Sequence, residues 1–317
     1  MIPKPSLDVV MASPRGFCAG VLRAVLMVER ALEKYGTPVY VRHQIVHNKH
    51  VVQRLERLGA IFIDDLNDIP VGTARPVLYS AHGVSKDVVQ QGKDLNLLTF
   101  DATCPLVSKV HREVERAYDS GDQVIMIGHA GHAEVIGTMG QAPEGAVLLV
   151  QNQDDVQTVT VRDPDHLVYV TQTTLSVQET EGIIRALLVR FPNIKHPKSE
   201  DICYATTNRQ AAVTQIARKV DVFLIIGAQN SSNSKRLLET AIQAGSPKAY
   251  LLNDAQDMDW AWLQGAGRVG ISSGASAPDD LVSGLLEEIK ARYDIRIEEV
   301  SAAFEDVNFK IPAALSI

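Results

Sequence analysis

The stretch SPRGFCAG, residues 13–20, decides how the chain begins to fold. It stands between the apolar run LDVVMA at residues 7–12 and the segment VLRAVLMVERALEKYG at residues 21–36. The run is typical of a buried strand, and the apolar residues of the segment recur at helical spacing. Cys18 therefore lies where a predicted strand turns into a predicted helix. A helix dipole favours a thiolate at such a position, and the thiolate is the form that binds metal.

Composition and charge limit the function classes. A chain of 317 residues that is 45% hydrophobic can bury a packed core and suggests two or three domains. The net charge is −7 and the sequence pI is near 5.7, with Lys and Arg spread along the chain, which argues against general affinity for nucleic acid or membranes. The N-terminus has no apolar signal core, and three cysteines make a disulfide framework unlikely. We expect a cytoplasmic protein with reduced thiols.

The order of apolar and amphipathic segments predicts the fold class. Short β-branched runs alternate with helical patterns in VLRAVLMVERALEKY, PVYVRH, VVQRLERLG, AIFI and VLYS. This order is typical of a parallel sheet with crossover helices, so the predicted class is α/β. The pattern restarts near residues 101 and 201. The sequence therefore predicts three related α/β units, at residues 16–102, 103–201 and 202–300, with residues 1–15 and 301–317 packing onto them.

The spacing of polar residues indicates an internal repeat of about one hundred residues. A polar loop follows Cys18, Cys104 and Cys203 after 29, 28 and 29 residues, at His47, His132 and Ser232. A second polar loop follows the same cysteines after 64, 69 and 73 residues, at His82, Thr173 and Ser276. Acidic helix starts recur between the two loops, in DDLND, DDVQT and DAQDM.

Three cysteines in equivalent positions favour a shared metal centre. Loops at the carboxyl ends of parallel strands gather at one edge and bind ligands there, so units around a pseudo-threefold axis would bring three thiols to one cavity. A single cysteine in an α/β core is more often a small buried hydrophobe, and catalytic thiol chemistry is a further alternative. No CxxC pair indicates a zinc ribbon. Three thiolates suit either a Cys₃ zinc site or, as the favoured reading, a four-iron cluster with one iron lacking a protein ligand.

The polar loops predict a cavity for phosphate oxygens. Its expected donors are the side chains of His47, His82, His132, Thr173, Ser231, Ser232, Asn233 and Ser276. The remaining histidines are expected in solvated or core positions; they are His43, His50, His111, His129, His166 and His196. Glu134 lies among glycines and histidines, and as a general acid it would need burial or a hydrogen-bonded relay to hold a proton near neutral pH. Its alternative role is a first-turn helix charge stabilised by the dipole.

Nine ordered blocks carry a resemblance that covers nearly the whole chain. They are PRGFCAGV, HQIVHN, SAHGVS, DATCPLV, GHAGHAEVIGTMGQ, TQTTLS, DICYATTNRQ, NSSNS and GASAP. In this order they resemble the 4-hydroxy-3-methylbut-2-enyl diphosphate reductase (LytB) family. The resemblance implies a trefoil of three α/β domains around a [4Fe-4S] cluster. It also implies reductive dehydroxylation of the allylic diphosphate to isopentenyl diphosphate and dimethylallyl diphosphate, the last step of the non-mevalonate isoprenoid pathway.

The same resemblance implies roles for individual residues. Cys18, Cys104 and Cys203 match the cluster ligands, and the fourth iron is left for the substrate hydroxyl. The substrate-binding positions are matched by His47, His82, His132, Thr173, Thr174, Ser231, Ser232, Asn233 and Ser276, and Glu134 matches the proton donor. No GxGxxG motif stands in the right context for a bound nicotinamide or flavin, so we expect an external one-electron donor such as ferredoxin or flavodoxin. An iron–sulfur hydro-lyase and a non-enzymatic metal or redox sensor are the alternatives.

Overall fold

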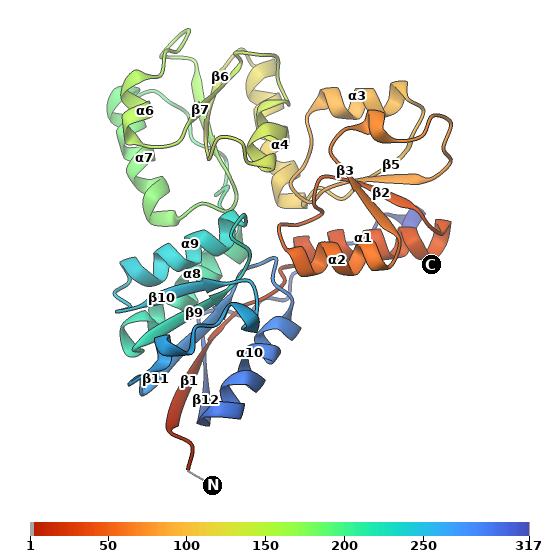
Figure 1. The fold of residues 1–317 in the computed structure, drawn as a ribbon. Coiled ribbons are helices and arrows are strands. Elements are labelled where there is room, and N and C mark those ends of the chain that lie inside the picture. The colour runs from red at the N-terminus through yellow and green to blue at the C-terminus, as the bar shows by residue number, and fades with distance from the viewer. Residues whose placement is uncertain (1–2, 317) are drawn as a thin grey trace. The chain divides into compact units, whose positions relative to one another are not determined.

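Within residues 3–316, which the structure describes, the computed structural model forms three parallel sheets (Figure 1). The strands are β1 (Ser6–Ser13), β2 (Val39–Arg42), β3 (Ala60–Ile63), β4 (Pro76–Tyr79), β5 (Leu98–Asp101), β6 (Gln123–Ile127), β7 (Val147–Val150), β8 (Leu167–Thr171), β9 (Val222–Ile226), β10 (Ala249–Leu252), β11 (Arg268–Ser273) and β12 (Asp294–Ser301). The α-helices are α1 (Ala19–Tyr35), α2 (Lys49–Arg57), α3 (Lys86–Asp94), α4 (Pro105–Asp119), α5 (Ala133–Met139), α6 (Gln153–Thr158), α7 (Val177–Arg190), α8 (Tyr204–Ile216), α9 (Ser232–Gln243) and α10 (Asp279–Arg292). The α/β class predicted from the sequence is confirmed.

The chain divides into two compact units. Unit 1 contains the chain as far as Ala19, His47–Lys49 and Tyr204–Asn308, and it holds the five-stranded sheet. Unit 2 contains Gly20–Val46, His50–Cys203 and the chain from Phe309 onward, and it holds the four-stranded and three-stranded sheets. The predicted boundaries at residues 102–103 and 201–202 each fall between the strands of two different sheets.

The three sheets share one strand order. The four-stranded sheet runs β3-β2-β4-β5, and the three-stranded sheet runs β7-β6-β8. In the three-stranded sheet, an isolated parallel bridge from Val168 of β8 to Lys195 takes the position that β5 has in the four-stranded sheet. The five-stranded sheet begins β10-β9-β11-β1 and adds β12 at its edge. In each sheet, therefore, the strand or bridge beside β4, β8 or β11 leads into one of the three cysteines.

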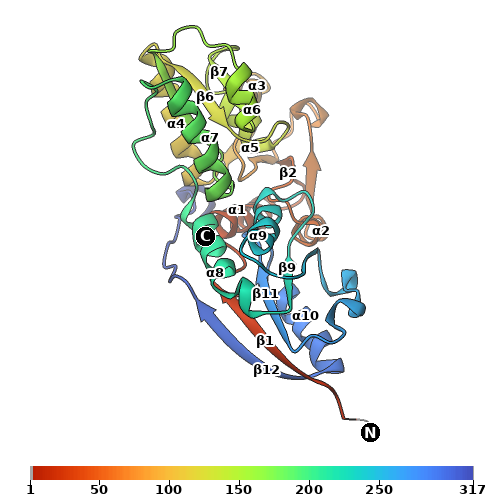
Figure 2. The same ribbon diagram turned by 90° about the vertical axis from the view of Figure 1, so that its left-hand side faces the viewer.

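The N-terminal strand belongs to the last sheet of the chain. Strand β1 pairs in parallel with β11 on one side and with β12 on the other (Figures 1 and 2). The register sets Met11 opposite Ile271 and Glu299. Within residues 1–15, which the sequence predicts to pack onto the units, Ser6–Ser13 thus form an interior strand of the sheet of unit 1.

The core of unit 1 has two layers because side chains alternate along each strand. Leu7, Val9 and Met11 face a cluster that includes α10, whereas Val10 and Ala12 face α8 and α9. All five side chains are almost completely buried. Helices therefore cover both faces, as expected for a parallel sheet. In unit 2 the same alternation on β6 sends Ile125 and Ile127 toward α7, and Val124 and Met126 toward α4.

Several acidic or polar residues begin short helices, as the repeat predicted. Asp65 caps the 3₁₀ helix η1 (Leu66–Asp68), and Asp254 caps η3 (Ala255–Asp257). Asn152 caps α6 through a bond from the amide of Asp155. Oxygen-bearing side chains at these positions satisfy backbone amides that have no partner inside the helix.

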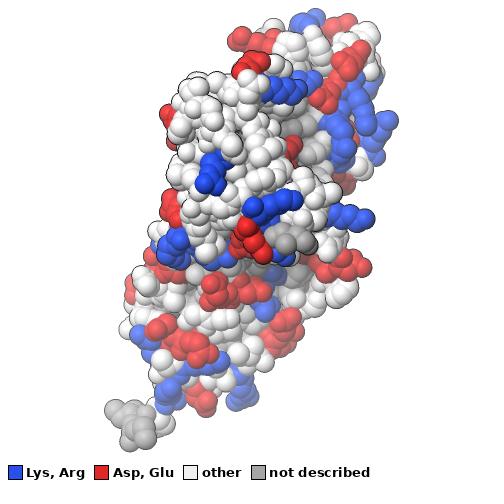
Figure 3. All heavy atoms as spheres, turned by 90° about the vertical axis from the view of Figure 1, so that its right-hand side faces the viewer, with Lys and Arg blue, Asp and Glu red and all other residues white. Residues whose placement is uncertain are grey.

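The surface carries mixed charge. On the face drawn in Figure 3, acidic and basic side chains are interspersed, and a broad part of the face carries few charges. Among residues 3–316, no helix combines the length and the apolar character that a membrane crossing requires.

Candidate functional site

All three cysteines stand at the start of a helix. Cys18 directly precedes α1, and Cys203 directly precedes α8. Cys104 is the N-cap of α4, followed by Pro105, whose fixed φ suits the first helical turn. Each thiol is partly exposed and none is in a disulfide. The three thiols therefore occupy the same place in the fold, directly before the first turn of a helix.

Each cysteine is tied by its backbone to one of the second polar loops. The amides of Cys18, Cys104 and Cys203 donate hydrogen bonds to the carbonyls of Ala275, Ala81 and Thr173, at 3.3, 3.0 and 3.0 Å. These loops lie at the ends of β11, β4 and β8. Cys104 and Cys203 thus each contact the second polar loop of the preceding repeat, and Cys18 contacts that of the last repeat. The spacing of residues in the sequence did not predict this pairing.

The cysteines are divided between the two units. Cys18 lies in unit 1, whereas Cys104 and Cys203 lie in unit 2. Across residues 3–316, no three His, Cys, Asp or Glu side chains form a group that could hold a metal ion. The ligand assignment of the three thiols stays a prediction.

Glu134 is a buried carboxyl group at the carboxyl edge of the three-stranded sheet. It lies in the first turn of α5 and is 2% exposed. Its Oε1 accepts a hydrogen bond of 2.6 Å from the amide of Thr173, and its Oε2 accepts one of 3.1 Å from the Thr173 hydroxyl. Burial raises the pKa of Glu134 to about 7, against the lowering effect of these two bonds. The carboxyl group can therefore hold and release a proton near neutral pH.

Thr174 is held by a residue that the sequence analysis missed. The side chain of Gln172 is completely buried, and its Nε2 donates a hydrogen bond of 3.0 Å to the Thr174 hydroxyl. Its Oε1 accepts a bond of 3.1 Å from the amide of His129. Gln172 thus connects the loop after β8 with the loop after β6. Its place inside the quoted block TQTTLS was the available signal.

His82 and His132 lie next to each other in unit 2. Their ring centroids are 5.6 Å apart and the rings meet edge to face. The Nδ1 atom of His132 accepts a hydrogen bond of 3.1 Å from the amide of Glu134. In the neutral ring the proton therefore sits on Nε2, which makes that atom a donor. The Ser80 hydroxyl lies 3.4 Å from Nδ1 of His82.

Close packing of backbone brings these two histidines together. Gly137 of α5 lies against the loop after β4, and a Cβ atom there would come within 3.0 Å of the Gly83 carbonyl group. The amide of Lys86 donates to the carbonyl of Gly140, at the end of α5. The Gln141 side chain adds a bond of 2.8 Å to the Val84 carbonyl. Glycine at position 137 therefore allows a contact that larger residues would prevent.

Unit 1 contains a chain of hydroxyl groups at the start of α9, which we name the serine cradle; it consists of Ser231, Asn233, Ser234 and Ser276. The Ser234 hydroxyl donates to Ser231 Oγ at 3.1 Å, and Ser231 Oγ lies 3.4 Å from Ser276 Oγ. The Ser276 hydroxyl donates to the carbonyl of His47 at 3.2 Å. Four of the predicted residues, His47, Ser231, Asn233 and Ser276, are thus brought together, and the adjoining Ser232 begins α9. Ser234 is the member that the sequence analysis missed.

Asn233 carries a buried side-chain donor. Its Oδ1 accepts a hydrogen bond of 2.8 Å from the amide of Ala275, whereas its Nδ2 is buried and makes no hydrogen bond to any of residues 3–316. The side chain is only 6% exposed. Gly274 allows the two loops to approach, since a Cβ atom there would lie 2.2 Å from Ser234 Oγ. A buried amide donor at the N-terminus of a twelve-residue helix suits a phosphate oxygen.

Three of the remaining histidines lie within hydrogen-bond distance of nearby oxygens, and a fourth is mostly buried. His43 and His166 lie 2.9 and 2.8 Å from the carboxylates of Asp64 and Asp163. His196 contacts the carbonyl of Pro197. Burial lowers the pKa of His111 to about 4, so its ring is neutral.

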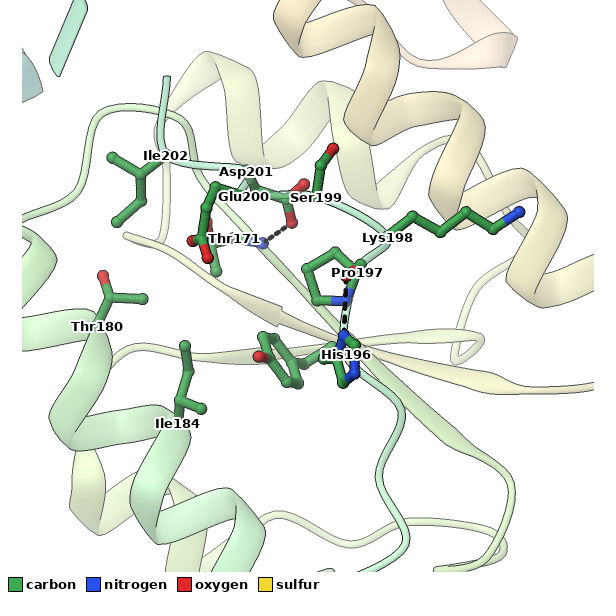
Figure 4. A pocket seen from close by; sticks show the side chains of 11 residues that line it. Thr171, Thr180, Ile184, His196, Pro197, Lys198, Ser199, Glu200, Asp201 and Ile202 are labelled. Carbon is green, nitrogen blue, oxygen red and sulfur yellow. Dashed lines mark hydrogen bonds between the residues drawn. The ribbon is translucent and has the colours of Figure 1, made fainter. Parts of the chain in front are cut away.

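A separate cavity of about 350 Å³ lies in unit 2 (Figure 4). It is lined by Tyr169 and Thr171 of β8, by Thr180 and Ile184 of α7, and by residues 196–202. None of the predicted site residues lines it. Its importance lies in the segment 196–202, which leads directly into Cys203.

Comparison with known sequences identifies relatives over the full length of the chain. The chain is 54% identical over 316 residues to the 4-hydroxy-3-methylbut-2-enyl diphosphate reductase of Phenylobacterium zucineum, with 100% of both chains covered. It is 55% identical over 311 residues to the protein of the same name from Cereibacter sphaeroides, covering 98% of this chain and 97% of that one.

Solved structures show the same fold. The E-1-hydroxy-2-methyl-but-2-enyl-4-diphosphate reductase from Plasmodium falciparum matches with a TM-score of 0.91 and 37% identity, covering 99% of this chain and 97% of that chain. A structure of (E)-4-hydroxy-3-methyl-but-2-enyl diphosphate reductase, the terminal enzyme of the non-mevalonate pathway, matches with a TM-score of 0.64 and 32% identity, covering 90% and 99%. The sequence model of the family described as LytB protein matches residues 9–290. The chain therefore belongs to the LytB protein family.

Proposed function

We propose that the protein is a 4-hydroxy-3-methylbut-2-enyl diphosphate reductase that forms isopentenyl diphosphate and dimethylallyl diphosphate. The names of its full-length relatives support this reaction. The observation that carries the proposal is the buried carboxyl group of Glu134, because burial raises its pKa to about 7. A reaction that removes a hydroxyl group as water needs such a proton donor.

The donor set fits an iron–sulfur cluster. Three thiols at helix starts, with no fourth cysteine in the chain, match a [4Fe-4S] cluster that has one iron without a protein ligand. Cys18, Cys104 and Cys203 would hold it, in a trefoil of units 16–102, 103–201 and 202–300. When bound, such a cluster supplies electrons one at a time and a Lewis-acid position for the substrate oxygen.

The serine cradle binds the diphosphate in this proposal. Asn233 Nδ2 offers a buried amide donor, and Ser231, Ser232 and Ser276 offer hydroxyl groups beside the N-terminus of α9. His47 lies in the same unit, and its carbonyl accepts a hydrogen bond from the Ser276 hydroxyl. His132 adds a donor at Nε2, and His82 lies beside it. Amide, hydroxyl and imidazole donors of this kind stabilise phosphate oxygens.

Glu134 supplies protons in this proposal. The C–O bond to the allylic hydroxyl breaks, the oxygen takes a proton and leaves as water, and the carbon skeleton takes a second proton and two electrons. Thr173 bonds to both carboxyl oxygens of Glu134 and orients the group, and Thr174 adds a hydroxyl held by Gln172. Burial keeps bulk water from the carboxyl group, so the proton goes to the bound substrate.

The two electrons come from an external one-electron donor such as ferredoxin or flavodoxin. We place the reaction in the cytoplasm, because thiols that must bind iron have to stay reduced. The net charge of −7, with Lys and Arg spread along the chain, argues against a nucleic-acid partner.

An anaerobic assay tests the proposal. The protein is purified without oxygen, its iron and sulfide are measured, and turnover of the allylic diphosphate is followed with a strong one-electron donor. We expect both isoprenoid diphosphates, with two electrons consumed per molecule formed. Product formation without consumption of the donor would indicate a hydro-lyase instead. A bound cluster with no turnover would indicate a sensor.

A further inference from the structure

A basic residue follows each cysteine after five or six positions. Arg23, Lys109 and Arg209 follow Cys18, Cys104 and Cys203. Each lies on the helix that its cysteine begins, namely α1, α4 and α8. Each donates hydrogen bonds to carbonyl groups in the few residues before a different cysteine. This shared feature has no role in the chemistry proposed above.

Lys109 holds the segment before Cys203. Its Nζ donates to the carbonyls of Ser199 and Glu200, both at 2.8 Å, and to Oδ1 of Asp201 at 3.0 Å. The Asp201 side chain is completely buried, and its Oδ2 accepts a bond of 2.9 Å from the amide of Thr171. Figure 4 shows this last bond beside the cavity that residues 196–202 border. Since the segment borders open space on that side, Lys109 supplies contacts that packing there does not provide.

Arg23 holds the segment before Cys104. Its Nη1 donates to the carbonyl of Thr103 at 3.1 Å, one residue before the cysteine, and its Nη2 lies 3.5 Å from the carbonyl of Asp101. Its Nε donates to the carbonyl of Lys310 at 3.0 Å. All of these residues belong to unit 2.

Arg209 holds the segment before Cys18. It is completely buried, and its Nε and Nη2 donate to the carbonyl of Gly16 at 3.2 and 2.8 Å. Its Nη1 pairs with Glu305 at 3.0 Å. Gly16 has a φ of +70°, and a Cβ atom there would lie 2.4 Å from Asp279 Oδ1. The turn before Cys18 is thus both confined and tied to α8, within unit 1.

We propose that Arg23, Lys109 and Arg209 are positioning residues, each of which sets the backbone of the next cysteine in a cyclic order. The helix after Cys18 holds the chain before Cys104, the helix after Cys104 holds the chain before Cys203, and the helix after Cys203 holds the chain before Cys18. A backbone held at this point sets the direction of the Cα–Cβ bond and therefore of the sulfur. This role toward the cluster rests on the proposed function, whereas the backbone effect does not.

Hydrogen exchange of the protein without metal tests the backbone effect. In Lys109→Met, we expect the amides of Cys203 and Thr171 to exchange at least about tenfold faster, since losing even one of the three charge-assisted hydrogen bonds of Lys109 corresponds to about that factor. The amide of Cys18 should not change. Lys109→Arg should restore slow exchange. Arg112→Met is the matched control, because Arg112 is on the same helix and its Nε donates to the carbonyl of Ser108 in that helix.

The other two positions must give the corresponding pattern. Arg23→Met should speed exchange at Cys104, and Arg209→Lys should speed it at Cys18. Because Arg23 is partly exposed, Arg23→Met can be measured if Lys109→Met does not fold. Equal acceleration at all three cysteine amides would show a general loss of stability and overturn the proposal, as would unchanged exchange at the next cysteine.

Iron content tests the role toward the cluster. After anaerobic reconstitution, we expect the iron affinity of Lys109→Met to be about tenfold lower than that of the wild type. The iron affinity of Arg112→Met should equal that of the wild type. Iron retention equal to the wild type, together with faster exchange, would overturn the positioning of the thiols. A wild-type protein that binds no cluster would contradict the proposed function and leave the exchange results valid.

Discussion

The surroundings of Glu134 and the serine cradle are built alike and act differently. Both lie where a parallel strand ends and a helix begins, α5 in the first case and α9 in the second. Around Glu134 the protein buries an acid and gives it two donors from Thr173. In the serine cradle, the protein buries an amide donor of Asn233 that has no acceptor among the residues that the structure describes.

The difference shows how burial acts on a charged and on a neutral group. Burial penalises the charged form of Glu134, so the carboxyl group keeps its proton up to about pH 7. Burial of the neutral Asn233 amide leaves an unmet hydrogen bond, which a phosphate oxygen can satisfy. In the proposed function, one kind of scaffold thus provides both a proton donor and an anion site.

The largest expected effect comes from removing the proton at Glu134. Glu134→Gln should lower turnover by about 10² to 10⁴, the range of a general acid. The amide oxygen of Gln can still accept the bond from the Thr173 amide, so the fold and the binding of diphosphate should persist. Iron content and substrate affinity are the controls. Full turnover in this variant would exclude the role of Glu134.

The pH dependence should follow the same carboxyl group. Above about pH 7 the rate should fall by about tenfold per pH unit as Glu134 loses its proton. Because folding raises the pKa from 4.5 to about 7, the proton stabilises the folded state fully below about pH 4.5. This stabilisation is lost as the pH rises through 7. Thermal unfolding at pH 6 and pH 8 should show the loss in the wild type and a smaller loss in Glu134→Gln.

A charge in the serine cradle should affect binding and leave the proton step intact. Asn233→Asp keeps an acceptor for the Ala275 amide and replaces the buried donor with a carboxylate. We expect the KM for the diphosphate to rise by about tenfold or more, with a smaller change in kcat. Asn67→Asp adds the same charge at an exposed position and is the control. An unchanged KM would remove Asn233 from the anion site.

The smallest effect should come from the Thr173 hydroxyl. Thr173→Val removes the bond to Glu134 Oε2 and keeps the amide bond to Oε1. In the wild type, the bond from the Thr173 hydroxyl lowers the pKa of Glu134. Its loss should therefore raise this pKa and move the alkaline limit of the rate to higher pH. Turnover should fall by less than about tenfold. A limit that moves to lower pH would contradict this account of the carboxyl group.

Local features could be predicted from the sequence because their causes are local. The helix expected at residues 21–35 appears as α1, Ala19–Tyr35, since its apolar spacing and the turn before it lie in one short stretch. Pro105 after Cys104 likewise marks a helix start. The candidate residues His47, Ser231, Asn233 and Ser276 were named from their loops, and the structure brings them together in unit 1.

Long-range partners could not be predicted in the same way. The apolar run at residues 7–12 indicates a strand, but nothing in it specifies pairing with β11, which is about 260 residues away. The bonds from Arg209 to Gly16 and from Lys109 to residues 199–201 are equally invisible in the sequence. Gln172 and Ser234 were inside the quoted blocks, yet only their burial and partners show what they hold.

The sequence by itself determined the α/β class, the three cysteines at helix starts and the intervals between polar loops, because periodicity and helix-start chemistry act over a few residues. Only the tertiary structure decided that Glu134 is buried enough to keep its proton up to about pH 7 and that Nδ2 of Asn233 is buried without a hydrogen bond to the described residues. Burial and hydrogen bonding depend on which distant segments fold against a side chain, and a linear pattern does not contain that information.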